Sequence, residues 1–220
     1  HPVCFLLPYL ASDTVWKCQL LELPSNTPNS WGLVLKRSHT HYWEMPAYNS
    51  TFLSEEDESA RIVGNFAILP IRTKFRGPSY PTNADYDIID EVLDLFRPNS
   101  FFRNFEIKSN SDRTLIYGIL YVSSCLNKLN RRVAKSEAVK ILNNLALEDF
   151  SIPGDPNFPL NTVFTGPQTR NDYDLLRGYI QQFRQELGDR LINILYKNDA
   201  TQPDKFWLAL SKRRFMNKSL

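Results

Sequence analysis

The chain has 220 residues, of which 42% are hydrophobic and 23% are charged, and its formal net charge at pH 7 is +2. This composition is typical of a globular protein long enough to bury a core, and it excludes disorder of the whole chain. The small net charge does not by itself indicate nucleic acid or an anionic membrane as a partner. Cys4, Cys18 and Cys125 are too irregularly spaced for a disulfide framework or a zinc motif, which favours a reducing compartment.

The rarer residue types are concentrated at the start of the chain. All three histidines and three of the four tryptophans come before Met45, and no histidine follows it. Residues 1–44 have no basic segment ahead of their apolar run, which Pro2 and Pro8 interrupt, so they are not typical of a signal peptide. We expect residues 1–44 to be an extension foreign to the domain, disordered or loosely packed. Residues 45–220 are then expected to form one domain.

Two apolar stretches lack helical spacing and are predicted to be extended. Residues 63–75 carry Pro70 in their middle, which removes a backbone donor and suits an edge strand better than a helix. Residues 101–108 are short and aromatic, with rough alternation of apolar and polar positions. We expect the two stretches to pair.

Residues between these stretches have the pattern of an amphipathic helix that ends near Pro98. The acidic residues come first, where they complement the positive end of the helix dipole: Asp85, Asp87, Asp90, Glu91 and Asp94. Because no histidine or second acidic cluster lies nearby in the sequence, we predict a solvated acidic face rather than an acid–base or metal site.

Residues 112–129 form the predicted centre of the fold. At a helical pitch their apolar side chains fall on every side of the cylinder, which is typical of a buried helix. The polar residues occur in the second half, so the first half is expected to be more enclosed. Ser109 to Asp112 supplies a start signal for the helix. The uninterrupted apolar part is too short for a membrane span, which needs about 20 residues.

Two further elements are predicted after the central helix. Ser136 is expected to cap an amphipathic helix that continues to about Leu147. Residues 150–167 contain four prolines and two glycines, so they are predicted to be an irregular loop. Such a loop is either a functional surface or a lid over the core.

Residues 172–196 form the longest predicted helix, about 36 Å at 1.5 Å per residue. Glu186 and Arg190 make an i, i+4 pair of favourable orientation on its more polar side. The apolar residues advance by three and four and form a stripe expected to pack against the central helix: Leu176, Ile180, Phe183, Leu187, Leu191 and Leu195.

The last predicted helix runs from Lys205 to about Phe215. At 100° per residue its apolar residues form two nearly opposite groups, which one core contact cannot bury together: first Phe206, Trp207 and Leu210, then Leu208 and Phe215. The second group, flanked by basic residues, should meet a partner or the tail folding back. The predicted partner interface comprises Leu208, Lys212, Arg213, Arg214, Phe215, Met216 and Lys218. The loop at 152–161 is the next candidate for the partner interface.

Residues 45–220 lack the usual catalytic combinations. Without histidine there is no Ser-His-Asp or Cys-His pair and no histidine-containing metal site. Cys125 lies alone in the central helix, where a thiol behaves as a small hydrophobe, and no phosphate-binding glycine motif occurs. The residues indicate a mainly α, non-enzymatic domain without metal or cofactor. The alternative is a small module whose basic tail binds nucleic acid or an acidic membrane.

Several stretches, in order over the whole domain, match one known family. They include MPAY at 45–48, GNFAILPIR at 64–72, FFRNFEIK at 101–108, DRTLIY at 112–117, IPGDPNFPLN at 152–161, YIQQFRQEL at 179–187 and FMNKSL at 215–220. From Met45 onward the chain thereby resembles subunit 3 of the actin-related protein 2/3 complex. That family starts at the position of Met45, so residues 1–44 are the main departure from it.

The resemblance implies a multihelical bundle with one buried central helix and a small extended element. It implies a non-catalytic structural subunit of the cytoplasmic complex that nucleates branched actin filaments in cortical actin structures. The expected partners are the other subunits, especially the actin-related protein 3 subunit, and the mother actin filament. Nucleic acid and membrane insertion are not expected. ATP in such complexes is bound by the actin-related subunits, so no cofactor is implied for this chain.

Overall fold

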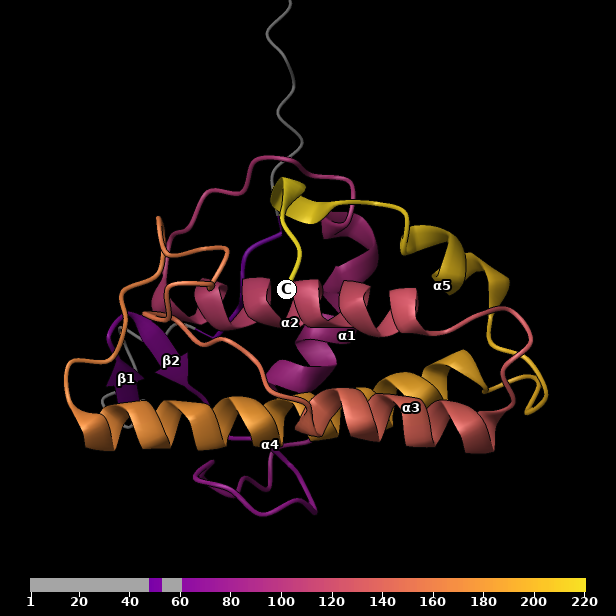
Figure 1. The fold of residues 1–220 in the computed structure, drawn as a ribbon, viewed down its shortest axis with the longest axis horizontal. Helices are drawn as coiled ribbons and strands as arrows, with labels where there is room; N and C mark the ends of the chain where they lie inside the picture. The colour runs from indigo at the N-terminus through magenta and orange to yellow at the C-terminus, as the bar shows by residue number, and fades with distance from the viewer. Residues whose placement is uncertain (1–47, 53–60) are drawn as a thin grey trace, which may run out of the picture. The chain divides into compact units, whose positions relative to one another are not determined.

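The structure is a computed structural model that describes residues 48–52 and 61–220, which belong to one compact unit, Ala47–Leu220. The predicted extension at 1–44 and the acidic run at 55–58 lie outside the described residues. The mainly α fold with a small extended element is confirmed (Figure 1). Its elements are β1 Arg61–Val63, β2 Phe66–Ile68, α1 Ile88–Asn99, α2 Asn110–Lys128, α3 Lys135–Leu147, α4 Arg170–Leu195, α5 Lys205–Leu210 and the 3-10 helix η1 Phe215–Asn217.

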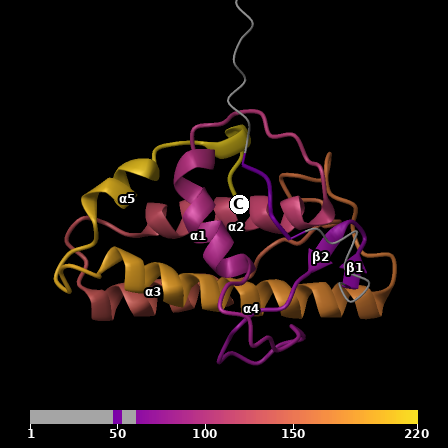
Figure 2. The ribbon, with the colours of Figure 1, turned by 180° about the vertical axis from the view of Figure 1, so that it is seen from behind.

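Helix α2 is the buried centre of this unit, as predicted. It contacts β2 and each of the other four α-helices; α1 crosses it, while α3 and α4 lie along another side (Figures 1 and 2). Every residue from Thr114 to Val122 is buried, whereas Asn127 and Lys128 are exposed. The more enclosed first half is thus confirmed. Among the described helices, none combines the length and the hydrophobicity needed to cross a membrane.

The start of α2 also anchors the first described residues. Ser109 and Asp112 form a capping box, in which the Ser109 hydroxyl accepts from the Asp112 amide at 3.2 Å and Asp112 accepts from the Ser109 amide at 3.0 Å. The same carboxyl group accepts from the Ser50 amide at 2.7 Å. The carboxylate of Glu91 on α1 accepts from the Ser50 hydroxyl at 2.6 Å and from the Thr51 amide at 2.7 Å. These bonds join residues 50–51 to both helices.

Gly118 makes the crossing of α1 over α2 possible. A Cβ at this position would lie 2.5 Å from Val92 Cγ2 and 3.1 Å from Phe183 Cζ. Carbon atoms in contact prefer separations of about 3.5–4.0 Å, so no side chain fits without displacing a neighbour. Glycine in a helix interior is normally unfavourable, and here the close packing of α1 and α4 on α2 accounts for it.

The strand pairing differs from the prediction. β1 pairs antiparallel with β2, and Val63 lies opposite Phe66, so the start of the first stretch pairs with the residues just before it and not with residues 101–108. Gly64 has φ of 62° and supplies the left-handed residue that a two-residue turn needs. Residues 101–108 are irregular, although Phe105 is buried.

The acidic face of α1 is only partly solvated: Asp85 and Asp94 are exposed as predicted, but the prediction is wrong for two other carboxylates. Asp87 and Glu91 are only 2% and 1% exposed. Arg190 of α4 donates to Asp87 and Asp90 at 2.7 Å, and its predicted pair with Glu186 forms at 2.7 Å. This pair therefore faces α1 instead of solvent. Burial disfavours the Asp87 carboxylate, but hydrogen bonds from Arg190 and a backbone amide outweigh that effect and lower its pKa.

Two helices begin slightly earlier than predicted. Ser136 does not cap α3, which starts at Lys135 after Ala134; the Lys135 amide instead donates to the Ala200 carbonyl at 2.9 Å. A distant loop thus replaces the expected side-chain cap. Helix α4 begins at Arg170, and its whole predicted apolar stripe is buried. This stripe packs against α3 as well as α2.

We predict that Gly118→Ala destabilises the protein although alanine is the better helix former. Overpacking costs about 1–3 kcal/mol, which exceeds the propensity gain of about 1 kcal/mol. Gly178→Ala on α4 is the matched control, because a Cβ there would meet Pro78 Cδ at an ordinary 3.4 Å. Urea unfolding should give a lower midpoint for Gly118→Ala and an equal or higher one for Gly178→Ala. An equal rise in the urea midpoint of both variants would contradict the close approach of Val92 and Phe183 to Gly118.

Candidate partner-binding surface

The C-terminal segment, which contains the predicted interface residues, begins with α5. The Asp204 carboxylate accepts hydrogen bonds from the amides of Phe206 and Trp207 at 2.7 and 3.2 Å, which caps the helix. The Trp207 ring stacks on Phe96 of α1, with centroids 5.6 Å and planes 5° apart. Leu208 is buried as well. Adjacent side chains thus hold α5 on the domain.

Helix α5 ends at Leu210, so the prediction of a helix to about Phe215 is wrong. The Ser211 hydroxyl donates to a carbonyl of the last turn at 2.7 Å and helps to end the helix. Further along, Met216 and Asn217 have φ of 52° and 55°. Left-handed residues of this kind cannot continue a right-handed helix.

Phe215 belongs to the core and not to a free surface. It is 1% exposed, and its ring contacts Phe105 edge-on at a centroid distance of 5.6 Å. The following amide, of Met216, donates to the Phe102 carbonyl at 3.0 Å. Because the helix stops earlier, Leu208 and Phe215 do not lie on one continuous helix face. The predicted second apolar side is therefore wrong, since both residues are buried inside the domain.

The other predicted interface residues remain accessible. Met216 is half-buried, and four basic side chains are exposed: Lys212, Arg213, Arg214 and Lys218. The guanidinium of Arg213 lies over the Phe101 ring, 4.8 Å from its centroid, and Phe101 is 54% exposed. We call these four basic residues and Phe101 the basic tail surface. No acidic residue occurs at 205–220, so the basic tail surface carries a positive charge.

The sequence patterns did not predict the exposure of two apolar side chains, those of Phe206 and Leu147. Phe206 was grouped with the core-facing residues but is 76% exposed, and Leu147 at the end of α3 is 56% exposed. Helix α5 has only six residues, and its cap and its two adjacent buried side chains determine how it lies on the domain. A periodicity of 100° per residue therefore does not predict which of its side chains are buried. Nothing in the local sequence distinguishes Phe206 from Trp207.

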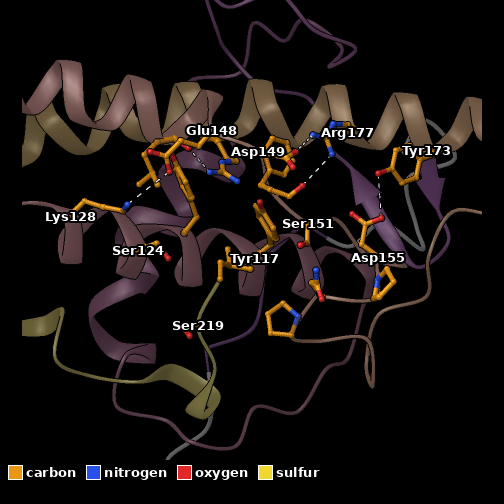
Figure 3. Close-up of a pocket in the computed structure, with 18 residues that line it drawn as sticks. Tyr117, Ser124, Lys128, Glu148, Asp149, Ser151, Asp155, Tyr173, Arg177 and Ser219 are labelled. Atoms are coloured by element: carbon orange, nitrogen blue, oxygen red, sulfur yellow. Dashed lines mark hydrogen bonds and ion pairs between the residues drawn. The ribbon is translucent and has the colours of Figure 1, made fainter.

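A cavity of about 620 Å³ lies between α2, α4 and the loop that follows α3 (Figure 3). Its lining includes Tyr117 and Tyr121 from α2, Arg177 and Arg184 from α4, and part of the loop at 152–161. The irregular conformation predicted for this loop is confirmed. The second candidate from the sequence thus forms one wall of a cavity.

Polar contacts at the rim hold the loop beside the cavity. Arg177 donates to Asp149 at 2.6 Å and to the Phe150 carbonyl at 3.2 Å, and Tyr173 donates to Asp155 at 3.3 Å (Figure 3). The Asp149 side chain is 93% exposed, and exposed pairs of this type contribute little to stability. Their role here is to orient the loop.

The described part of the chain holds one cysteine and no candidate metal cluster. Cys125 is fully buried, and burial raises the pKa of its thiol to about 12. At neutral pH the thiol is protonated, whereas the thiolate is the reactive form. Within residues 48–52 and 61–220, no three histidine, cysteine or acidic side chains come together in a group that could hold a metal ion.

Comparison with known proteins identifies the family of this chain. Residues 45–220 match the family model described as P21-Arc, the ARP2/3 complex ARPC3 (21 kDa) subunit. The chain belongs to this family. The matched region includes all described residues, and therefore also the basic tail surface and the residues that line the cavity.

Similar proteins in the P21-Arc family include three named actin-related protein 2/3 complex subunit 3. The one from Saccharomyces cerevisiae is 59% identical over 179 residues, which are 80% of this chain and 100% of the relative. The one from Schizosaccharomyces pombe is 52% identical over 177 residues, 80% of this chain and 100% of the relative. The one from Dictyostelium discoideum is 47% identical over 174 residues, which are 79% of this chain and 99% of the relative. The family resemblance noted from the sequence is confirmed.

We predict that Phe215→Ala lowers the free energy of unfolding by about 3–5 kcal/mol, because a buried phenylalanine is truncated. Phe206→Ala is the control: its side chain is 76% exposed, and its loss should change stability by about 0.5 kcal/mol or less. Denaturant unfolding of the two variants tests this difference. A larger effect for Phe206→Ala would show that α5 and not the tail carries the core contact.

Proposed function

We propose that the chain is a non-catalytic structural subunit of an actin-related protein 2/3 complex. The observation that carries the proposal is its 59% identity over 100% of a yeast relative named as subunit 3 of that complex. In this role it supports the nucleation of branched actin filaments in the cytoplasm, at cortical actin structures. The complex, and not this chain alone, is the functional unit.

We propose that the basic tail surface contacts an acidic face of an actin-related or actin partner. The partners that we propose are the actin-related protein 3 subunit and the mother filament. The charge of the surface supports this assignment, because Lys212, Arg213, Arg214 and Lys218 are exposed without an acidic residue in the same segment. The buried contacts of Phe215 hold the tail in place, so its basic groups are presented on an ordered segment.

The buried carboxylates and the thiol of the domain make structural contacts, which agrees with a structural role. Asp87 and Glu91, the most buried carboxylates of α1, accept hydrogen bonds from other segments and tie those segments to the helix. The thiol of Cys125 is protonated and enclosed. These groups stabilise the fold, and their geometry supports a scaffold instead of a reaction centre.

Charge reversal tests the proposed surface. Lys212→Glu with Arg213→Glu should leave the melting temperature nearly unchanged, since both side chains are exposed, but should weaken incorporation into the complex by about tenfold or more. Incorporation is measured by co-purification with the actin-related subunits at two salt concentrations. Higher salt should reduce the difference between wild type and variant.

Arg131→Glu with Arg132→Glu is the matched control, because these adjacent arginines are equally exposed but lie in the turn before α3. The control should assemble like wild type. If both double variants lose assembly equally, general charge and not the basic tail surface decides binding. Undiminished assembly of the Lys212→Glu, Arg213→Glu variant would place the partner contact elsewhere.

We also propose that residues 1–44 are dispensable for the domain. The family match begins at residue 45, and the relative from Saccharomyces cerevisiae aligns over its full length with 80% of this chain. A chain that begins at Met45 should keep both its melting temperature and its incorporation into the complex. A lower melting temperature or failed incorporation would show that the preceding residues contribute to the fold or to the interface.

A further inference from the structure

Arg184, on α4, is a buried arginine without an acidic partner among the described residues. It is 5% exposed, its Nη2 donates to the Leu145 carbonyl at 2.5 Å, and its buried Nε has no hydrogen-bond acceptor. By contrast, Arg177 and Arg190 of the same helix pair with carboxylates at 2.6 and 2.7 Å. Arginine stays charged at physiological pH, so the interior holds a positive charge without a counter-ion.

Aromatic rings hold the guanidinium of Arg184 in place. It lies 4.8 Å from the centroid of the Tyr121 ring and 4.3 Å from that of Phe150. Cation–π contacts of this kind partly offset the cost of burial and restrict the guanidinium plane. They supply no negative charge, so the group remains able to bind an anion.

A neutral donor lies beside the same cavity. The hydroxyl of Tyr121 is buried without an oxygen acceptor, its polar neighbours being the Cys125 thiol and the Arg184 guanidinium, and both Tyr121 and Tyr117 line the cavity. Burial raises the pKa of both tyrosines, so their hydroxyls keep their protons at neutral pH. A buried hydroxyl without an oxygen acceptor is unfavourable, and an acceptor that enters the cavity would satisfy it.

The size and charge of the cavity restrict what can enter it. Its volume of about 620 Å³ lies within the range of about 300–1,000 Å³ found for small-molecule sites. The rim carries Glu148, Asp149 and Asp155 together with two cations, Lys128 at 3.9 Å from Glu148 and Arg177 at 2.6 Å from Asp149, whereas the positive charge of Arg184 lies inside. Because the rim charges largely offset one another, the single charge of Arg184 inside the cavity favours a ligand with one negative charge. The aromatic walls favour an apolar stem behind that charge.

We propose that this cavity binds a carboxylate on a short apolar stem, with Arg184 as its counter-ion and the Tyr121 hydroxyl as a second donor. The stem packs between Tyr117 and Phe150. A free small acid and the C-terminal residue of another polypeptide both carry this group, and the experiment separates them. The inference rests on the cavity alone and does not depend on the function proposed above.

The test uses the full chain and two pairs of probes. Phenylacetate is compared with its neutral amide, and the tripeptide Gly-Gly-Phe with a free carboxylate is compared with its C-terminal amide. Affinities are measured by calorimetry, and the site is mapped by NMR at Tyr121 and Arg184. Each acid should bind about tenfold or more tightly than its amide, because only the acid forms charge-assisted hydrogen bonds.

Two variants locate the charge. Arg184→Met removes the charge and keeps an apolar side chain, and it should weaken binding of the acid probes by about tenfold or more. Lys128→Met is the matched control, since Lys128 also lines the cavity but its side chain is 54% exposed and lies 3.9 Å from Glu148. Its affinity should stay within about twofold of wild type.

The proposal is overturned if neither acid binds, if acids and amides bind equally, or if Arg184→Met binds like wild type. Should Arg184→Met fail to fold, Tyr121→Phe keeps the ring and removes the hydroxyl, and its binding should be about fivefold weaker. An unchanged affinity in Tyr121→Phe would overturn the assignment of the second donor. A tripeptide acid that binds tenfold tighter than phenylacetate identifies a polypeptide end as the ligand; otherwise the ligand is a free small acid.

Discussion

The fold depends on the absence of a side chain at one position. Where α1 crosses α2, Gly118 lets Val92 and Phe183 approach a point that a Cβ atom would occupy, at 2.5 and 3.1 Å. Three helices therefore meet around one residue, and α2 is enclosed along its first half. The same packed helices also supply Tyr117 to the cavity wall and Phe96 to the contact with Trp207 of α5.

The half-buried Arg190 and the buried Arg184 of α4 show how differently one residue type acts in this domain. Arg190 reaches three carboxylates at 2.7 Å and joins α4 to α1, so its charge is neutralised within the fold. Arg184 has aromatic faces and one carbonyl instead. The first arrangement makes a fixed connection between helices. The second leaves a buried positive charge without a carboxylate partner among the described residues.

Sequence patterns predicted what depends on periodicity and missed what depends on distant contacts. The enclosure of α2 and the stripe of α4 followed from apolar spacing, and the Ser109 start signal followed from local capping chemistry. The burial of Asp87 could not be predicted, because its partner Arg190 lies 103 residues away. Of the predicted interface residues, the basic ones are exposed but two apolar ones are not. Leu208 is buried within α5, whereas Phe215 is buried after the chain has left the helix at Leu210 and the tail contacts residues 102 and 105.

The anchoring of residues 50–51 has a consequence for the order in which the domain assembles. The Ser50 amide bonds to Asp112, 62 positions later, and its hydroxyl bonds to Glu91, 41 positions later. A ribosome makes this segment first among the described residues, yet its acceptors exist only after α1 and the start of α2 have been synthesised. Closing contacts between such distant positions is slow compared with forming local helices. We therefore expect residues 50–51 to dock after α1 and α2 have come into contact.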